Sequence, residues 1–142
     1  MNPSWKKILL AAVIASLLLL PAASAGDWPQ WRGPNRESVC SEKGLLESFP
    51  AAGLKVRWRA PVGWGFSSPV VAQGRVYLAD SEAVKPKAKE RLHCFDEATG
   101  KPLWTFQTSQ SLRASPMTYM FDNRQLVAIA SGTSVLVFGL TD

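Results

Sequence analysis

Histidine and cysteine are scarce in this sequence. His93 is the only histidine, and Cys40 and Cys94 are the only two cysteines. The spacing of the cysteines does not mark a metal site. His93 alternates with its neighbours on an expected strand and has no second base, carboxylate partner or metal ligand to complete a site. We therefore expect a structural or surface role for His93, and no metal-binding residues.

Motifs for nucleophilic and acid–base catalysis are also lacking. Ser67 and Ser68 precede a proline, without the Gly-x-Ser-x-Gly frame of a nucleophile elbow. Asp96 and Glu97 are explained by turn chemistry. Asp80 precedes a charged stretch, so we expect it to be solvated. The sequence accordingly predicts no catalytic residue.

Charged residues make up 19% of the chain, and the formal net charge is +5. Two of the positive charges, Lys6 and Lys7, lie at the N-terminus. A modest positive balance is typical of a soluble exported protein, and it does not indicate a nucleic-acid partner.

The first 25 residues have the pattern of a secretory signal peptide. Lys6 and Lys7 precede an apolar run from Ile8 to Leu20, and Ala23-Ser24-Ala25 supplies a small-residue cleavage site. The run is short for a membrane span, although an uncleaved anchor is the alternative. We expect cleavage between Ala25 and Gly26, a periplasmic or secreted location, and no stable membrane span afterwards. In an oxidising compartment Cys40 and Cys94 could form a disulfide, or Cys94 could simply be buried in its apolar run.

The remainder divides into an irregular arm at 26–53 and a repeat region at 54–142. Prolines at positions 29 and 34 exclude a helix interior from the arm. The alternation of apolar and charged residues in Leu54–Ala60 predicts a half-buried strand. Further short strands are expected at Ser68–Ala72, Arg75–Asp80, Arg91–Asp96 and Pro102–Gln107, with a hydrophilic loop at 81–90. Together, residues 66–107 predict one antiparallel four-stranded meander.

The pattern then begins again. Ser115-Pro116-Met117 echoes Ser68-Pro69-Val70 at a distance of 47 residues. Strands are expected at Ala114–Tyr119, Gln125–Ala130 and Val135–Gly139, which gives a partial second unit at 112–140. A four-stranded repeat of this length predicts an all-β fold of propeller blades.

The segment from Phe95 to Trp104 resembles the Asp-x-x-Thr-Gly-x-x-x-Trp repeat of the pyrroloquinoline-quinone (PQQ) propellers. That family includes quinoprotein alcohol dehydrogenases and a non-enzymatic lipoprotein of outer-membrane barrel assembly. The resemblance implies that Asp96, Thr99 and Gly100 organise a turn, and that Trp58 and Trp104 pack between blades. Trp64, in a glycine-rich turn, is the aromatic residue that we expect could contact a ligand.

The resemblance does not carry over a cofactor site. In the dehydrogenases the quinone and its calcium ion lie on the ring axis near an adjacent Cys-Cys pair, and several blades supply the ligands. This sequence has no such cysteine pair, and no cluster of oxygen ligands for calcium is evident. No residue is therefore assigned to a quinone or a metal, and no cofactor is expected.

About two blades are present, which are too few for a ring of about four to eight. We expect Leu54–Ala60 to complete the last blade beside Gln125–Ala130 and Val135–Gly139, and Gln107–Arg113 to mark an internal deletion. The first hypothesis is a non-enzymatic binding or assembly module that associates with itself or with another propeller-blade protein. A remnant or subunit of a quinone-dependent dehydrogenase is the alternative, and a truncated product without a stable fold is a third.

Overall fold

The computed structural model describes residues 26–84 and 86–140, which form seven strands in two antiparallel sheets. The signal peptide, which we expected to be helical and to end at Ala25, lies outside the described residues. Within those that are described, no helix has the length and apolar character needed to cross a membrane. The chain is therefore all-β over the region that the structure describes, as the sequence predicted.

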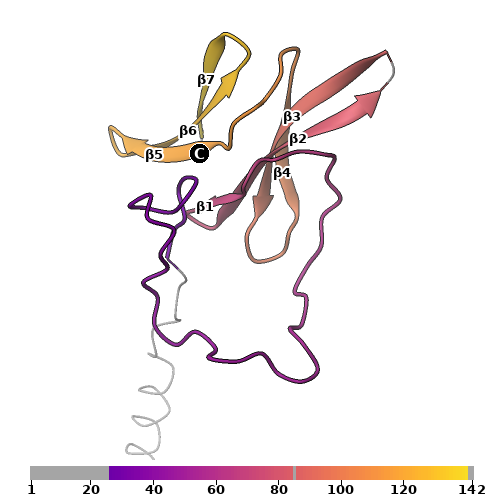
Figure 1. Ribbon diagram of the computed structural model, residues 1–142. Helices are drawn as coiled ribbons and strands as arrows, with labels where there is room; N and C mark the ends of the chain where they lie inside the picture. The colour runs from indigo at the N-terminus through magenta and orange to yellow at the C-terminus, as the bar shows by residue number, and fades with distance from the viewer. Residues whose placement is uncertain (1–25, 85, 141–142) are drawn as a thin grey trace, which may run out of the picture.

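The first sheet has four strands in sequential order: β1 (Val70–Ala72), β2 (Arg75–Val84), β3 (Lys87–Asp96) and β4 (Pro102–Thr108). The second sheet has three: β5 (Met117–Phe121), β6 (Arg124–Ser131) and β7 (Ser134–Gly139). Figure 1 shows the two sheets side by side, with the connection from β4 to β5 crossing between them. They do not close into a ring.

Matching hairpin turns explain the repetition of the first strands in each sheet. Gln73 and Gly74 both have positive φ angles, 51° and 73°, and so do Asp122 and Asn123, at 49° and 57°. Two successive residues with positive φ match the right-handed twist of a two-residue hairpin. These turns join β1 to β2 and β5 to β6.

Three of the expected elements are wrong or displaced. Leu54–Ala60 forms no strand, and the second sheet keeps three strands because this segment lies against the first sheet instead. Residues 81–90 are not a loop, because β2 and β3 continue through them as one long hairpin paired from Arg75–Asp96 to Val84–Lys87. Of the strand expected at Ser68–Ala72, only Val70–Ala72 pairs with β2.

The core lies between the two sheets. Alternation along each strand sends one set of side chains from each sheet to this interface. Tyr77, Leu92 and Cys94 are each at most 1% exposed on the first sheet, and Val127 and Ile129 are buried on the second. Trp104 lies at the margin, with its ring centroid 6.2 Å from that of Tyr77 and 5.8 Å from that of Phe138. We call this side of the first sheet its inner face and the opposite side its outer face.

The irregular N-terminal segment links the first strands of the two sheets, β1 and β5. Trp28 exchanges two backbone hydrogen bonds with Val71 in β1, at 2.7 and 2.9 Å, and the carbonyl of Pro29 accepts a bond from the Thr118 amide in β5 at 2.8 Å. Gly33 lies so close to the Trp28 ring that a Cβ atom would overlap it. The arm therefore acts as a clip across the two sheets.

The turn between β3 and β4 is built by the Asp-x-x-Thr-Gly sequence. Asp96 Oδ1 accepts hydrogen bonds from the Thr99 hydroxyl at 2.6 Å and from its amide at 2.9 Å, and these bonds lower the Asp96 pKa. Gly100 has φ +71°, and its missing side chain leaves room for the ring of Trp58. The Trp58 indole donates a hydrogen bond to the Glu97 carbonyl at 2.8 Å. The turn thus provides a seat for Trp58.

We expect Gly100→Ala to lower the free energy of unfolding by about 1–3 kcal/mol, because the new methyl group combines backbone strain with a clash against Trp58. Gly74→Ala is the matched control, since Gly74 has φ +73° but nothing within 4 Å of the added Cβ. It should cost about 1 kcal/mol from backbone strain alone. Urea unfolding followed by circular dichroism measures both, and equal losses would show that the Trp58 seat contributes nothing.

Candidate functional site

The outer face of the first sheet carries a row of polar side chains at the level of β2 and β3. Asp80 is 3% exposed, not solvated as the sequence suggested. Its carboxylate accepts two hydrogen bonds from the Arg91 guanidinium, at 2.9 and 2.7 Å, and a third from the Gly63 amide. Arg91 also reaches Glu82 at 2.9 Å. The carboxylate is therefore fully engaged by groups of the protein.

The ionisation of Asp80 follows from these contacts. Burial alone would raise its pKa, but the donors from Arg91 and Gly63, together with the nearby imidazole of His93, outweigh burial and lower the pKa to about 2. The same ion pair raises the pKa of Arg91. Asp80 is thus a fixed negative charge at neutral pH, which makes it unsuited to accept protons in catalysis.

His93 lies between Asp80 and Thr105, and this is an arrangement that the sequence analysis missed. Its Nε2 atom is 2.9 Å from Asp80 Oδ1, without the alignment of a hydrogen bond, and its Nδ1 atom is 3.0 Å from the Thr105 hydroxyl. The expectation that His93 has no carboxylate partner is therefore wrong. The signal lay in the alternation of β2 and β3, which places positions 78, 80, 91 and 93 on one face.

The three side chains resemble an acid, a base and a hydroxyl nucleophile in line, but the geometry does not favour acyl transfer. Thr105 lies in the middle of β4, paired with His93 in the β3–β4 ladder. A nucleophile of this kind needs backbone donors aimed at a developing oxyanion, which loops and helix N-termini supply better than a regular ladder. The arrangement is better explained as a network that joins three strands across the outer face.

Two of the hollows in the structure bear on a possible ligand site. One, of about 450 Å³, is lined by Trp64 and Phe66 together with Asp80, Glu90, Leu112 and Arg113. The Trp64 backbone pairs with Ser81, which holds the aromatic segment at the edge of β2 while its side chain stays 83% exposed. Trp64 is therefore accessible, as a ligand contact would require.

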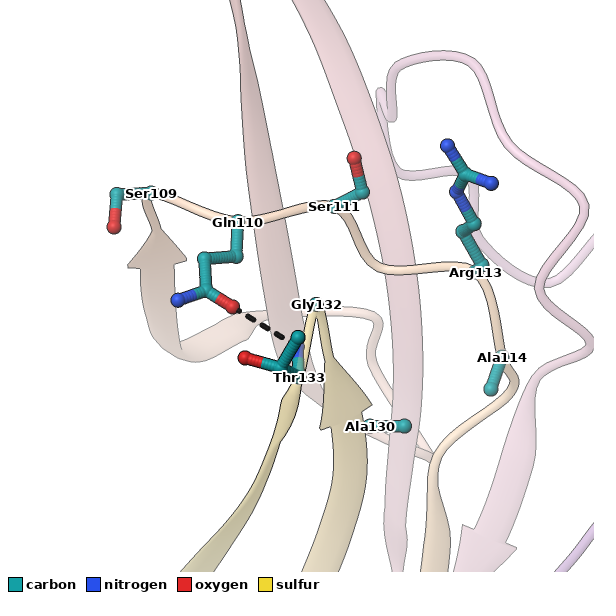
Figure 2. A pocket seen from close by; sticks show the side chains of 8 residues that line it. All are labelled: Ser109, Gln110, Ser111, Arg113, Ala114, Ala130, Gly132 and Thr133. Atoms are coloured by element: carbon teal, nitrogen blue, oxygen red, sulfur yellow. Dashed lines mark hydrogen bonds between the residues drawn. The ribbon is translucent and has the colours of Figure 1, made fainter.

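The second hollow, of about 700 Å³, lies where the connection from β4 to β5 meets the turn between β6 and β7. Figure 2 shows Gln110 of this connection directed at the turn, where its Oε1 atom accepts a hydrogen bond from the Thr133 amide at 3.2 Å. The Gly132 amide donates to the Ser111 carbonyl at 3.0 Å. These bonds fasten the connection to the second sheet, so this hollow is part of the junction between the sheets.

Cys40 and Cys94 are separate free thiols, so the disulfide that the sequence allowed does not form in this structure. Cys40 is exposed in the irregular segment, whereas Cys94 is in the core, where burial raises the pKa of its thiol to about 11. Over the described part of the chain, no group of three or more His, Cys, Asp or Glu residues is placed to hold a metal ion.

Comparison with known proteins bears on these features. Residues 35–141 match the family model described as outer membrane protein assembly factor BamB. The chain belongs to this PQQ-repeat family. Asp96, Thr99, Gly100 and Trp104 of the repeat motif therefore form one turn and strand of a PQQ-repeat blade, and the two sheets are parts of a propeller.

Curated relatives of this PQQ-repeat protein are much longer. It is 24% identical over 137 residues to the lupanine 17-hydroxylase [cytochrome c] of a Pseudomonas species, which covers 92% of this chain and 18% of that protein. It is 33% identical over 87 residues to the 1-butanol dehydrogenase (quinone) of Thauera butanivorans, which covers 61% of this chain and 12% of the relative. No solved structure matches significantly. The chain is related to quinoprotein dehydrogenases and spans less than a fifth of their length.

We expect Asp80→Asn to lower the free energy of unfolding by about 2 kcal/mol at neutral pH, because it leaves Arg91 without its buried counter-charge. The pKa of Asp80 falls from 3.8 unfolded to about 2 folded. Its stabilisation is therefore complete above about pH 4 and is lost as the pH falls through 2.

Urea unfolding at a series of pH values between neutrality and acid tests this expectation. The wild-type chain should lose stability in that acidic window, and the Asp80→Asn variant should lose less. Glu82→Gln is the control, because the Glu82 side chain is 47% exposed and binds the same arginine. Equal effects of the two substitutions would contradict the assignment to the buried carboxylate.

Proposed function

We propose that this chain is an exported, non-enzymatic PQQ-repeat module that works by binding a further blade. The supporting observation is an apolar face of the second sheet that points away from the first. Its exposed side chains are Met117 at 37%, Tyr119 at 38%, Val135 at 69% and Val137 at 51%. A continuous apolar sheet face of this kind marks an interaction surface.

Comparing equivalent strands of the two sheets indicates what covers such a face. The third strands of the two sheets match when Phe95 of β3 is aligned with Phe138 of β7, because a tryptophan packs over each of them, Trp58 over Phe95 and Trp104 over Phe138. Leu92 and Cys94 then correspond to Val135 and Val137. The first two are 1% and 0% exposed in the core, where the second sheet covers them. The exposed face thus repeats a pattern that, one blade earlier, is buried by a neighbouring blade.

Chemical features of the outer-face network support a binding role over catalysis. The Asp80 carboxylate accepts hydrogen bonds from Arg91 and from the Gly63 amide, and His93 is 8% exposed. Neither side chain is therefore free to act on a substrate. Export rests on the signal pattern at residues 1–25, which favours a periplasmic or secreted location. Assembly between blades outside the cytoplasm accounts for the engaged polar side chains and for the signal pattern.

We expect the purified exported chain to associate, and Val135→Glu to weaken that association, because a buried charge without a partner is costly at an apolar interface. Size-exclusion chromatography with light scattering measures the change in mass. Val39→Glu is the matched control, because Val39 is similarly exposed, at 64%, but lies in the irregular segment. A monomeric wild-type chain with cooperative unfolding would contradict a function in self-assembly.

The curated relatives favour a second candidate, a part of a quinone-dependent dehydrogenase, since two of them are named as quinone or cytochrome-linked oxidoreductases. Titration with pyrroloquinoline quinone and calcium, followed by tryptophan fluorescence, separates the two candidates. For a binding module we expect no saturable quinone binding. Saturable binding that supports reduction of a dye by an alcohol would favour the dehydrogenase.

A further inference from the structure

The edge strand of the second sheet has an unpaired side. The first sheet runs β1-β2-β3-β4, whereas the second ends at β7, which corresponds to β3. Within the described residues no strand occupies the place of β4 beside β7. Among the described residues the backbone groups along that side of β7 have no strand partner, and edges of this kind pair readily with another strand.

The segment Leu54–Ala60, in turn, is strand-like but has no strand partner among the described residues. Leu54 and Val56 are 60% and 62% exposed, and the segment has no ladder partner among the described residues. Figure 1 shows it running along the first sheet on the side away from the second sheet. Its apolar and charged residues nevertheless alternate as in a strand. The segment thus has the residue pattern of a strand but is not paired in either sheet.

The position of Trp58 identifies the sheet that is missing. Trp104, on the edge strand β4, packs over Phe138 of the following sheet with ring centroids 5.8 Å apart and planes inclined at 35°. Trp58 packs over Phe95, the residue equivalent to Phe138, at 6.4 Å and 33°. Trp58 therefore takes the position that a tryptophan on the fourth strand of a preceding blade would take.

From this equivalence we propose that Leu54–Ala60 of one chain pairs with β7 of a second copy and completes its three-stranded sheet. The exposed face of that sheet then packs on the outer face of the first chain, where Val76 and Leu78 are half-buried and Phe95 lies under Trp58. The contact reproduces between two copies the interface that already joins the two sheets within one. The proposal names the partner of the binding function proposed above and rests on it.

The register of the new pairing follows from β3 and β4. In that ladder Leu92 lies opposite Phe106, and Cys94 lies opposite Trp104. Leu92 corresponds to Val135, and Phe106 corresponds to Ala60 when Trp104 is aligned with Trp58, because each lies two residues after its tryptophan. Val135 of one copy should therefore lie opposite Ala60 of the next. Since the two surfaces are different, the contact is head-to-tail, and repetition closes into a ring of whole chains if the rotation permits.

Directed disulfide formation tests the register. One chain carries Ala60→Cys and a second carries Val135→Cys, both with Cys40→Ser so that no other exposed thiol remains among the described residues. Opposed positions in a ladder bring Cβ atoms close enough for mild oxidation to link them. We expect the mixture to yield a several-fold excess of disulfide-linked dimer over either variant alone.

The matched control mixes Val39→Cys with Val135→Cys in the same background, and it should give no excess over its separate components. An excess of the Ala60–Val135 product alone supports the pairing. Association by light scattering without that excess overturns the strand pairing but leaves a function in assembly intact. A folded monomer with no cross-link overturns the pairing and the self-assembly function together. Circular dichroism confirms that each variant is folded.

Discussion

The packing of an outer-strand tryptophan over the next sheet is the interaction on which the rest of this structure depends. Trp104 reaches from β4 to Phe138 and also contacts Tyr77, so one side chain seals the core that the two sheets share. Large aromatic groups contribute strongly to such interfaces because they bury much apolar surface with few rotatable bonds. Neither sheet would bury both of its faces alone, and each blade is stable only beside another.

The polar network on the outer face serves the same arrangement. Burial of Asp80 is costly by itself, and only the combined donors of Arg91 and Gly63 make it tolerable. In return, the carboxylate fixes the backbone at Gly63, a few residues beyond Trp58. His93 and Thr105 extend the network to β4. Through the bond from the Gly63 amide to Asp80, the network holds the incoming segment against the sheet.

The two sheets differ most in which faces are covered. The inner face of the first sheet is buried by the second, while the equivalent face of the second sheet is exposed. In a repeat protein, an uncovered blade face and an incomplete sheet are two aspects of one demand for a neighbour. The exposed valines of β7 and the unpaired segment Leu54–Ala60 are the two features on which the proposed association with another blade rests.

The sequence by itself determined the class of fold, the tight turns and the repeat family, because these depend on local patterns. Alternation specifies strands, Gly74 and Gly100 fit positive φ angles, and the Asp96–Trp104 motif forms one continuous turn and strand. Only the tertiary structure decided which residues meet across strands. Asp80 and His93 are distant in sequence, and their meeting depends on a ten-residue pairing that a charged, loop-like stretch concealed. The place of Leu54–Ala60 was likewise beyond local pattern, because a strand forms only where a sheet edge is within reach.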